Sequence, residues 1–335
     1  MENHKNILLD SHGRDHAYLR ISLIERCNLR CTYCMPEEGV ALSPKSHLMT
    51  YEEIYKIAKT FSDHGVTKIR LTGGEPLIRK DLPVILEKLA TLPVELSITS
   101  NAVIIDKFID VLKANGVNKI NVSLDSLDEG KFKHITRRNE FKKVYNNILL
   151  LVEEGFKVKV NAVLMKGFND NEIIDFINFT KDLPISVRFI EFMPFDGNKW
   201  DMGKMVSYAE VMKYVNEAFE NENFERLQDA PNDTAKNYKI KDYKGTFAII
   251  SSVTNPFCDS CNRLRLTANG QLKNCLFSSG ESDILTTLRA GKSIEPIIRK
   301  AVQAKFKVRG GMDTLKKLKE PKLHNNNRSM ITIGG

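Results

Sequence analysis

The stretch YLRISLIERCNLRCTYC, residues 18–34, decides the fold, because it joins a β-rich run directly to three closely spaced cysteines. Its first seven residues are mostly branched and apolar, which predicts a strand. The remainder contains a CxxxCxxC pattern with an aromatic residue before its last cysteine, made by Cys27, Cys31, Tyr33 and Cys34. In α/β barrels the loops that follow the strands carry the catalytic groups. We therefore expect a barrel-like fold with a cysteine-bearing loop after its first strand.

The same alternation of short β-branched runs and longer amphipathic segments continues to about residue 220. It predicts helices between the strands, for example Tyr51–Asp63 and Asn171–Lys181. Six strand and helix units in series favour an α/β fold, a partial (β/α)6-type TIM barrel with a parallel sheet. The six predicted strands are Tyr18–Ile24, Lys68–Thr72, Val94–Thr99, Lys119–Leu124, Lys157–Leu164 and Ser186–Phe192.

The alternation stops near residue 225. Beyond it we predict antiparallel strands, then two helices and a polar tail. We therefore divide the chain into a barrel domain, residues 1–225, and a C-terminal α+β extension, residues 226–335. The strands predicted in the extension are Tyr238–Ser252, Arg263–Thr267 and Gln271–Leu276.

The composition is that of an ordinary folded protein, with 42% hydrophobic and 27% charged residues among 335. The formal net charge of +8 suggests an anionic partner, and charge alone leaves both a nucleotide and a nucleic acid open. No apolar run is long enough for a signal peptide or a membrane span, so we expect a cytoplasmic protein without a membrane partner. In a reducing compartment, its six cysteines are more often ligands or catalytic groups than disulfides.

The first cysteine triad supplies three thiolates, whereas a cubane 4Fe-4S cluster has four irons. One iron is then left without a protein ligand, and it can bind the amino and carboxylate groups of S-adenosylmethionine (SAM). Structural zinc is the alternative interpretation. Zinc prefers four closed ligands, and no fourth cysteine or histidine lies beside this triad. A cluster with an open iron is therefore the better interpretation.

This spacing resembles the CxxxCxΦC signature of the radical SAM superfamily, in which Φ is aromatic. Residues 72–76 (TGGEP) follow the second predicted strand and resemble the superfamily motif that holds the amino group of SAM. Glycines allow close backbone approach, and the Glu75 carboxylate can accept a hydrogen bond from an ammonium. The resemblance implies that the cluster passes an electron to SAM, which yields a 5′-deoxyadenosyl radical that abstracts hydrogen from a substrate.

The remaining cysteines form a second set that is again one ligand short: Cys258, Cys261 and Cys275. A zinc ribbon would need a second pair, and Cys275 has no cysteine or histidine neighbour to form one. We therefore predict a second 4Fe-4S cluster. Its open iron can bind a substrate directly, for instance through a purine nitrogen or an exocyclic oxygen.

The second triad, together with motifs along nearly the whole chain, resembles the GTP 3′,8-cyclase family of radical SAM enzymes. The terminal Gly334 and Gly335 are also similar, because the family ends in a double glycine that reaches into the active site. The segments that carry the resemblance are residues 19–22 (LRIS), 69–76 (IRLTGGEP), 120–125 (INVSLD), 188–193 (RFIEFM) and 262–265 (NRLR).

The resemblance implies a lyase that opens molybdenum cofactor biosynthesis. It would convert GTP into (8S)-3′,8-cyclo-7,8-dihydroguanosine 5′-triphosphate, by abstraction of the ribose 3′ hydrogen and attack of the carbon radical on guanine C8. The implied cofactors are SAM and two 4Fe-4S clusters. The implied partners are an electron donor such as flavodoxin or ferredoxin, and a cyclic pyranopterin monophosphate synthase that takes the product onward. A homodimer is compatible with the resemblance, and no nucleic acid is expected.

Carried over residue by residue, the resemblance assigns all six cysteines to the two clusters. It implies a SAM site that consists of Tyr33, Gly74, Glu75, Ser123 and Met193. Asn161, on the fifth predicted strand, is a further candidate for this site. It implies a GTP site of Arg20, Arg70, Thr99, Lys159, Arg188, Arg263 and Arg265. Of these, Arg263 and Arg265 are the expected catalytic residues, assisting the electron and proton delivery that ends the reaction. Cationic side chains suit a triphosphate, and arginines in buried strands need an anionic partner.

Two positions depart from the family pattern. Ala102 stands where the family usually has glycine, which puts the backbone of the turn after the third strand in doubt. Residues 136–138 (TRR) differ from the usual threonine-glycine-arginine.

Two other classes of protein share part of this sequence pattern. A peptide-modifying radical SAM enzyme with an auxiliary cluster shares the first triad and the barrel, but such enzymes usually carry more cysteines in the C-terminal extension. A zinc or iron-sulfur module that binds nucleic acid fits the positive charge, but it leaves residues 72–76 and the first triad as coincidences.

Overall fold

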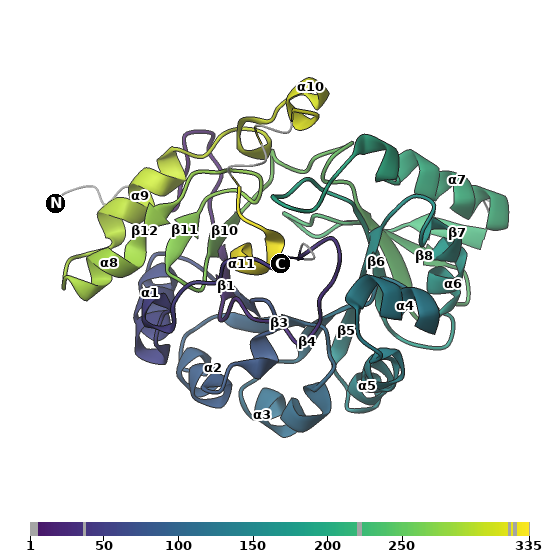
Figure 1. Ribbon diagram of the computed structural model, residues 1–335, viewed down its shortest axis with the longest axis horizontal. Helices are drawn as coiled ribbons and strands as arrows, with labels where there is room; N and C mark the ends of the chain where they lie inside the picture. Colours follow the sequence, from purple (N-terminus) through teal and green to yellow (C-terminus); the bar gives the residue numbers. More distant parts are fainter. Residues whose placement is uncertain (1–5, 36–37, 220–222, 321–322, 324–326, 335) are drawn as a thin grey trace.

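One curved sheet forms the centre of the computed structural model, which describes residues 6–35, 38–219, 223–320, 323 and 327–334. Within these residues the sheet is 12-stranded, in the order β12-β11-β10-β1-β2-β3-β4-β5-β6-β9-β8-β7. Figure 1 shows the strands arranged as an arc around a central space. The strands are β1 (Tyr18–Ser22), β2 (Lys68–Thr72), β3 (Glu95–Ser100), β4 (Lys119–Ser123), β5 (Lys157–Leu164), β6 (Ser186–Glu191), β7 (Phe224–Arg226), β8 (Lys236–Ile240), β9 (Thr246–Ile250), β10 (Arg263–Leu266), β11 (Gln271–Lys273) and β12 (Ser282–Asp283).

The middle of the sheet is parallel, from β10 through β1 to β6 and on to β9. Antiparallel strands flank it at both edges. No pairing joins β12 to β7 in the described part of the chain, so the barrel is open. The predicted α/β fold with a parallel sheet is thus confirmed. The first six strands agree with the predicted ranges, and β2 and β5 agree at both ends.

The C-terminal strands differ from the prediction. The range Tyr238–Ser252 is wrong as a single strand, because a turn at residues 241–245 divides it into β8 and β9. The pairs β8–β9 and β10–β11 are antiparallel, as expected. However, β9 and β10 are also parallel to β6 and β1, and they extend the sheet on both sides. The division at residue 225 falls within β7 and stays a prediction, while the sheet itself continues across it.

Helices cover the convex side of the arc (Figure 1). This is the side on which right-handed crossovers between parallel strands place them. No helix in the described ranges is long and apolar enough to cross a membrane. The α-helices are α1 (Tyr51–Asp63), α2 (Leu82–Ala90), α3 (Ile109–Ala114), α4 (Glu129–Thr136), α5 (Phe141–Glu153), α6 (Ile173–Asn178), α7 (Tyr208–Ala218), α8 (Ile284–Arg289), α9 (Glu295–Gln303), α10 (Leu315–Leu318) and α11 (Met330–Ile333).

Helix α1 shows how local sequence sets these boundaries. Thr50 caps its N-terminus by accepting from the Glu53 N–H, while the Glu53 side chain accepts from the Thr50 N–H, a capping box. One face of the helix buries Ile54, Ile57, Ala58 and Phe61. The helix ends just before Gly65, which has a φ of 108°. Both predicted ends, Tyr51 and Asp63, are confirmed.

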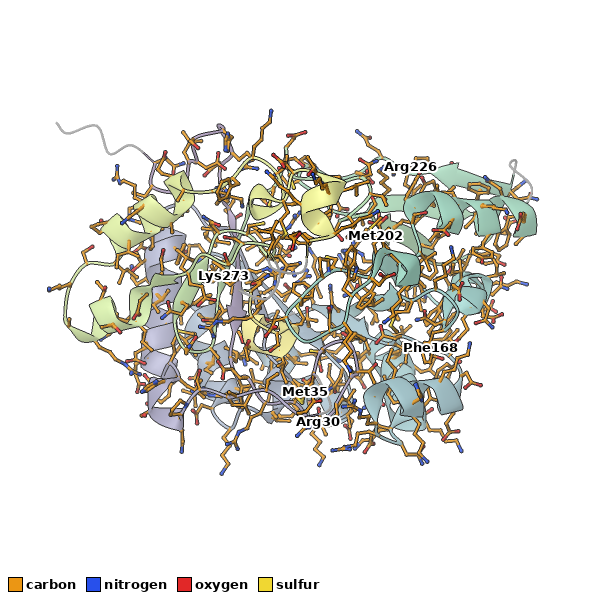
Figure 2. All side chains as sticks on the ribbon, turned by 45° about the horizontal axis from the view of Figure 1, so that its top comes forward. Arg30, Met35, Phe168, Met202, Arg226 and Lys273 are labelled. Atoms are coloured by element: carbon orange, nitrogen blue, oxygen red, sulfur yellow. The ribbon has the colours of Figure 1, made fainter. Side chains whose placement is uncertain are left out.

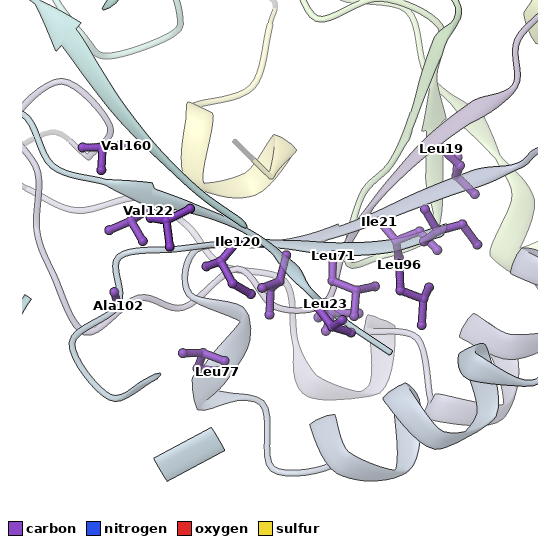
Figure 3. Close-up of a cluster of buried hydrophobic side chains, with 14 of the residues drawn as sticks. Leu19, Ile21, Leu23, Leu71, Leu77, Leu96, Ala102, Ile120, Val122 and Val160 are labelled. Carbon is purple, nitrogen blue, oxygen red and sulfur yellow. The ribbon is translucent and has the colours of Figure 1, made fainter. Parts of the chain in front are cut away.

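Strand alternation divides the sheet into an apolar face and a polar face. Leu19, Ile21 and Leu71 point towards the helices and belong to the main hydrophobic core, as Figure 3 shows. Arg20 lies between Leu19 and Ile21 in sequence, and Arg70 directly precedes Leu71. Both arginines line a cavity on the opposite face. A closed TIM barrel fills this inner space with branched aliphatic side chains. Here the inner space is left for a ligand.

Both departures from the family pattern fall on left-handed backbone. Ala102 has a φ of 59° and Arg137, the C-cap residue of α4, a φ of 54°. The Ala102 turn keeps its hydrogen bonds, because its N–H donates to Ser100 Oγ and its carbonyl accepts from the Asn147 amide. Left-handed conformation costs a residue with a Cβ about 1–2 kcal/mol. These two residues are therefore places of local backbone strain.

Replacing Arg137 with glycine should stabilise the protein. Glycine relieves the left-handed strain. It also costs about 0.5–1 kcal/mol, because its greater backbone freedom in the unfolded chain is lost on folding, so a net gain in stability of about 0.5–1 kcal/mol is expected. Thermal unfolding of Arg137→Gly measures it. The matched control is Lys133→Gly, an exposed position inside the same helix, which should lose about 1 kcal/mol. Equal destabilisation by both substitutions would contradict the assignment of strain.

Candidate active site

The first cysteine triad lies in the loop after β1. The N–H groups of Arg30 and Thr32 donate to carbonyl oxygens at the end of α4. Cys27 Sγ accepts from the Leu29 N–H at 3.4 Å and from the Asn101 amide at 3.6 Å. All three cysteines of the triad are half-buried and free of disulfides. The loop therefore presents three thiols that are fixed by neighbouring loops.

Burial disfavours thiolates at this triad. It raises the pKa of Cys27 to about 11 and that of Cys34 to about 12, and it also raises the pKa of Cys31. Burial and the nearby Asp125 raise the pKa of Tyr33, whose hydroxyl donates to Asp125 Oδ2 at 2.8 Å. Metal ligands are deprotonated, and a cationic metal group offsets the cost of burying their charge. Three free thiols on one loop thus fit a 4Fe-4S cluster with an open iron.

Gly73 and Gly74 let the loop after β2 pack directly against the cysteine loop. A Cβ on Gly74 would lie 2.2 Å from the carbonyl oxygen of Arg26, and one on Gly73 would lie 2.6 Å from that of Ile24. The same two carbonyls accept the N–H groups of Glu75 and Gly74, at 2.8 Å and 2.7 Å. Only glycine permits this approach, because any side chain would collide with the backbone.

The Glu75 side chain lies between the loops that follow β2 and β3. Its side chain is fully buried, and its carboxylate accepts from the Leu77 N–H, Ser100 Oγ and the Asn101 N–H. Burial raises its pKa to about 7 despite these bonds. Glu75 is therefore a positioning residue, which ties the loops after β2 and β3 together and holds Asn101 beside Cys27. The predicted contact between Glu75 and the amino group of SAM stays a prediction.

A cavity of about 470 Å³ lies on the polar face of the sheet. All seven residues predicted for GTP line it, and so do the three cysteines of the second triad. Asn161 and Met193 line it as well. The described lining does not include the first triad, Tyr33, Gly74 or Ser123. The structure thus brings the predicted nucleotide residues and the second triad to one place, and of the residues predicted for SAM it places Asn161 and Met193 with them.

Strand register aligns the cationic side chains in rows. Arg265 on β10, Arg20 on β1 and Arg70 on β2 occupy one row across three neighbouring strands. On the other side of the arc, Arg188 on β6 lies beside Asn161 on β5. Side chains in one row of a sheet project from the same face. Three guanidinium groups from segments far apart in sequence therefore converge on the cavity.

The cavity has a strongly positive interior. Burial, together with the neighbouring arginines, lowers the pKa of Arg70 to about 10 and that of Lys159 to about 7. Burial would raise the pKa of Tyr18, but Arg20, Arg70 and Lys68 outweigh it and lower the value to about 8. The guanidinium carbons of Arg20 and Arg70 each lie 5.5 Å from the centre of the Tyr18 ring. Mutual repulsion of this kind is relieved when an anion binds.

Several lining residues carry buried polar atoms that have no hydrogen-bond partner in the described part of the chain. Buried polar groups in folded proteins are nearly always paired, so a group of such exceptions needs an explanation. A polar ligand in the cavity supplies one. The atoms are Tyr18 Oη, Arg20 Nε, Asn121 Oδ1, Asn161 Oδ1, Arg188 Nε, Ser252 Oγ, Asn262 Oδ1, Asn274 Oδ1 and Arg309 Nε.

The second triad lies among cationic groups. Cys258 Sγ accepts from the Arg309 N–H at 3.4 Å, and Cys261 Sγ accepts from Lys305 Nζ at 3.5 Å. Burial would raise the pKa of Cys261, but Lys305 and Arg263 outweigh it and lower the value, whereas burial raises the pKa of Cys258. Three free thiols with adjacent N–H and ammonium donors fit an anionic iron-sulfur cluster.

The C-terminal segment enters the central space of the arc, where Figure 1 shows α11 beside β1. The buried Lys273, labelled in Figure 2, anchors it by donating to Asn327 Oδ1 at 3.1 Å. At the end of the segment, Arg265 donates to the Gly334 carbonyl at 2.8 Å. A Cβ on Gly334 would lie 2.7 Å from Thr72 Oγ1. Gly334 thus contacts the row of arginines, while Gly335 lies outside the described residues.

Four cationic residues beside the cavity or the second triad were not predicted from the sequence: Lys68, Arg309, Lys305 and Arg14. Lys68 was detectable, because it lies two residues before Arg70 in β2 and alternation places both on one face. Arg14 donates to the carbonyl oxygens of Cys258 and Lys307, both at 2.8 Å, and so fixes the second triad from the N-terminal segment. Arg14 and Lys305 had no local signal, because their partners are distant in sequence.

Comparison with known proteins adds an independent finding. Residues 21–180 match the Radical SAM superfamily, and residues 185–310 match Molybdenum Cofactor Synthesis C. The chain is 47% identical over 336 residues to the mitochondrial GTP 3′,8-cyclase of Arabidopsis thaliana, covering 98% of this chain and 84% of that protein. It is 46% identical to molybdenum cofactor biosynthesis protein 1 of Mus musculus, over 98% of this chain. That match covers 51% of the mouse protein, so the chain spans about half of its length.

Solved structures support the same fold. The crystal structure of Streptococcus suis SuiB bound to S-adenosylmethionine matches with a TM-score of 0.61 and 17% identity. The match covers 87% of this chain and 68% of SuiB. At this identity the likeness concerns the fold alone.

Proposed function

Because the chain belongs to the GTP 3′,8-cyclase family of radical SAM proteins, we propose that it converts GTP into the 3′,8-cyclised dihydro nucleotide that opens molybdenum cofactor biosynthesis. One observation carries the proposal. A single cavity of about 470 Å³ is lined both by the three cysteines of the second triad and by all seven residues predicted for GTP. A nucleotide that reaches from an iron to a row of arginines fits such a lining.

In this proposal the two triads hold two 4Fe-4S clusters. Cys27, Cys31 and Cys34 hold the cluster that binds SAM, and Gly74 brings the loop after β2 against them. Cys258, Cys261 and Cys275 hold the cluster that faces GTP. When bound, the first cluster and SAM supply the radical that removes a hydrogen from the substrate.

The residues of the chain bind and orient the nucleotide. Arg20, Arg70 and Arg265 offer a row of guanidinium forks to the triphosphate, with Lys159 and Arg188 across the cavity. Arg263, beside Cys261, lies towards the second cluster. Clamping both ends of the nucleotide restricts the ribose between them. Such positioning contributes several kcal/mol to a ring closure, about 7–11 kcal/mol at its upper limit.

The resemblance also predicts partners. We infer an electron donor such as flavodoxin or ferredoxin and onward use of the product by a cyclic pyranopterin monophosphate synthase; a homodimer is compatible with the family. Each of these stays a prediction from the family.

Binding of GTP should take up protons at pH 8. The pKa of Lys159 is lowered to about 7, so this amine is mostly neutral at pH 8 in the free protein, and a bound triphosphate raises the pKa again. At pH 6 the amine is already charged, and little uptake by Lys159 follows. Calorimetry in buffers of different ionisation enthalpy measures the uptake. The Lys159→Arg variant, charged throughout, should take up close to one proton less at pH 8. Equal uptake by both proteins would contradict this assignment.

The direct test of the function is an anaerobic incubation of the iron-loaded protein with SAM, dithionite and GTP. The expected products are 5′-deoxyadenosine and a cyclised nucleotide. If SAM is cleaved while GTP stays intact, the radical SAM assignment stands, but the substrate must be reassigned, with a peptide as the next candidate.

A further inference from the structure

The charge balance of the cavity bears on which ionic form of the triphosphate it accepts. Within the described residues, seven of its cations form no ion pair with a carboxylate. They are Arg20, Arg70, Lys159, Arg188, Arg263, Arg265 and Arg309. Lys68 and Lys119 also line the cavity, but both pair with Glu95. A fully ionised triphosphate carries about four negative charges, so the seven unpaired cations, with Lys159 charged once the nucleotide is bound, exceed its charge.

The lining offers little that would hold a metal ion. Its single described carboxylate is Asp233, in the loop before β8. Both oxygens of Asp233 are already in use: Oδ1 accepts from the Thr234 and Ala235 N–H groups, and Oδ2 accepts from the Asn237 amide at 3.1 Å. Protein sites for Mg²⁺ with a nucleotide ordinarily use one or two carboxylates together with the phosphates. Asp233 instead closes its own turn.

A divalent ion would also be repelled. The pKa of Arg70 is lowered by burial and by three other arginines, which shows that the cations already repel one another before any ligand binds. Adding two more positive charges with Mg²⁺ would oppose the attraction that brings the triphosphate in. It would also occupy phosphate oxygens that the guanidinium groups of Arg20, Arg70 and Arg265 bind as forks.

We propose that this cavity binds the nucleoside triphosphate free of Mg²⁺, with the arginine row and Lys159 in the place that the metal occupies in other nucleotide sites. The inference rests on the proposed function, because it takes GTP as the substrate. Its consequence follows from mass action. Mg²⁺ and the protein compete for the same triphosphate, so the apparent affinity falls in proportion to the fraction of nucleotide that remains uncomplexed.

The test is a titration of the anaerobic, cluster-loaded protein with GTP, once in excess EDTA and then at increasing Mg²⁺. Ionic strength is held constant with NaCl, because general screening also weakens such binding. Above the dissociation constant of the Mg²⁺–GTP complex, each tenfold rise in free Mg²⁺ should raise the apparent Kd about tenfold. An apparent Kd that is unchanged or lower with Mg²⁺ overturns the inference while leaving the proposed function intact. Absence of GTP binding under both conditions overturns both.

Asp233→Asn gives a second, independent readout. If Asp233 only closes its turn, this variant should bind GTP at least as tightly as the unaltered protein, because a negative charge near the phosphates is gone, and it should show the same weakening with Mg²⁺. If the variant instead loses a stimulation by Mg²⁺ that the unaltered protein shows, Asp233 is a metal ligand and the inference is wrong.

Discussion

Replacing Cys275 with serine should abolish cyclisation of GTP while SAM is still cleaved. Cys275 is one of three cysteines in the second triad and lines the cavity with the arginines, whereas the first triad lies in a separate loop after β1. Loss of one of only three thiolates removes a cluster, so iron should fall from about eight to about four per chain. Product formation should fall by at least about 10³-fold, because GTP loses one of its two anchors. Iron analysis, together with separate assays of 5′-deoxyadenosine and nucleotide product, measures this.

The matched control is Cys27→Ser in the first triad. It should also halve the iron, but it should eliminate both 5′-deoxyadenosine and the cyclised product. The two variants therefore separate the roles of the triads by which product survives. If Cys275→Ser retains all its iron, or if it loses SAM cleavage together with cyclisation, the assignment of a separate second cluster is wrong.

Replacing Arg20 with alanine should weaken GTP binding about 100-fold. Arg20 lies in the middle of the row, between Arg265 and Arg70, and it forms no ion pair with a described carboxylate. A charge-assisted hydrogen bond contributes about 1.5–3 kcal/mol, and about 3 kcal/mol corresponds to roughly a 100-fold change in Kd. The free energy of unfolding should not fall, because the substitution relieves repulsion with Arg70 and Arg265. Calorimetric titration and thermal unfolding test the two parts.

Two further variants serve as controls for the Arg20→Ala variant. Arg20→Lys keeps the charge but loses the planar fork, so its affinity should be intermediate. Arg289→Ala removes an exposed arginine that pairs with Glu53 far from the cavity lining, and it should leave GTP binding unchanged. Equal losses in Arg20→Ala and Arg289→Ala would indicate that general charge, and not the arginine row, holds the nucleotide.

The parts of the fold that follow from local pattern could be predicted. Strands β2 and β5 combine β-branched residues with clear boundaries, and both match the predicted ranges at each end. Alternation within β2 also explains why Arg70 points into the cavity while Ile69 and Leu71 are buried against the helices. Local pattern likewise located the first cysteine triad and the pair Cys258 and Cys261, because their spacing is short, whereas Cys275 was added as the one remaining cysteine.

The parts that depend on distant partners could not be predicted. Strand β10 is parallel to β1 because it completes the sheet beside it, and nothing within residues 263–266 specifies that neighbour. The hydrogen bonds of Glu75 could not be predicted either, because Ser100, at the end of β3, and Asn101, just after it, are about 25 residues away in sequence. Lys305 contacts Cys261 across a wide gap in sequence, so only the folded chain reveals it.

We propose that this cavity holds GTP so that a radical generated from SAM removes its ribose 3′ hydrogen. The most direct measurement uses GTP deuterated at the ribose 3′ position, incubated anaerobically with the iron-loaded protein, SAM and dithionite. We expect one deuterium in 5′-deoxyadenosine and a nucleotide product that no longer carries the 3′ deuterium. Cleavage of SAM to 5′-deoxyadenosine without deuterium, with the labelled GTP recovered intact, would contradict the claim.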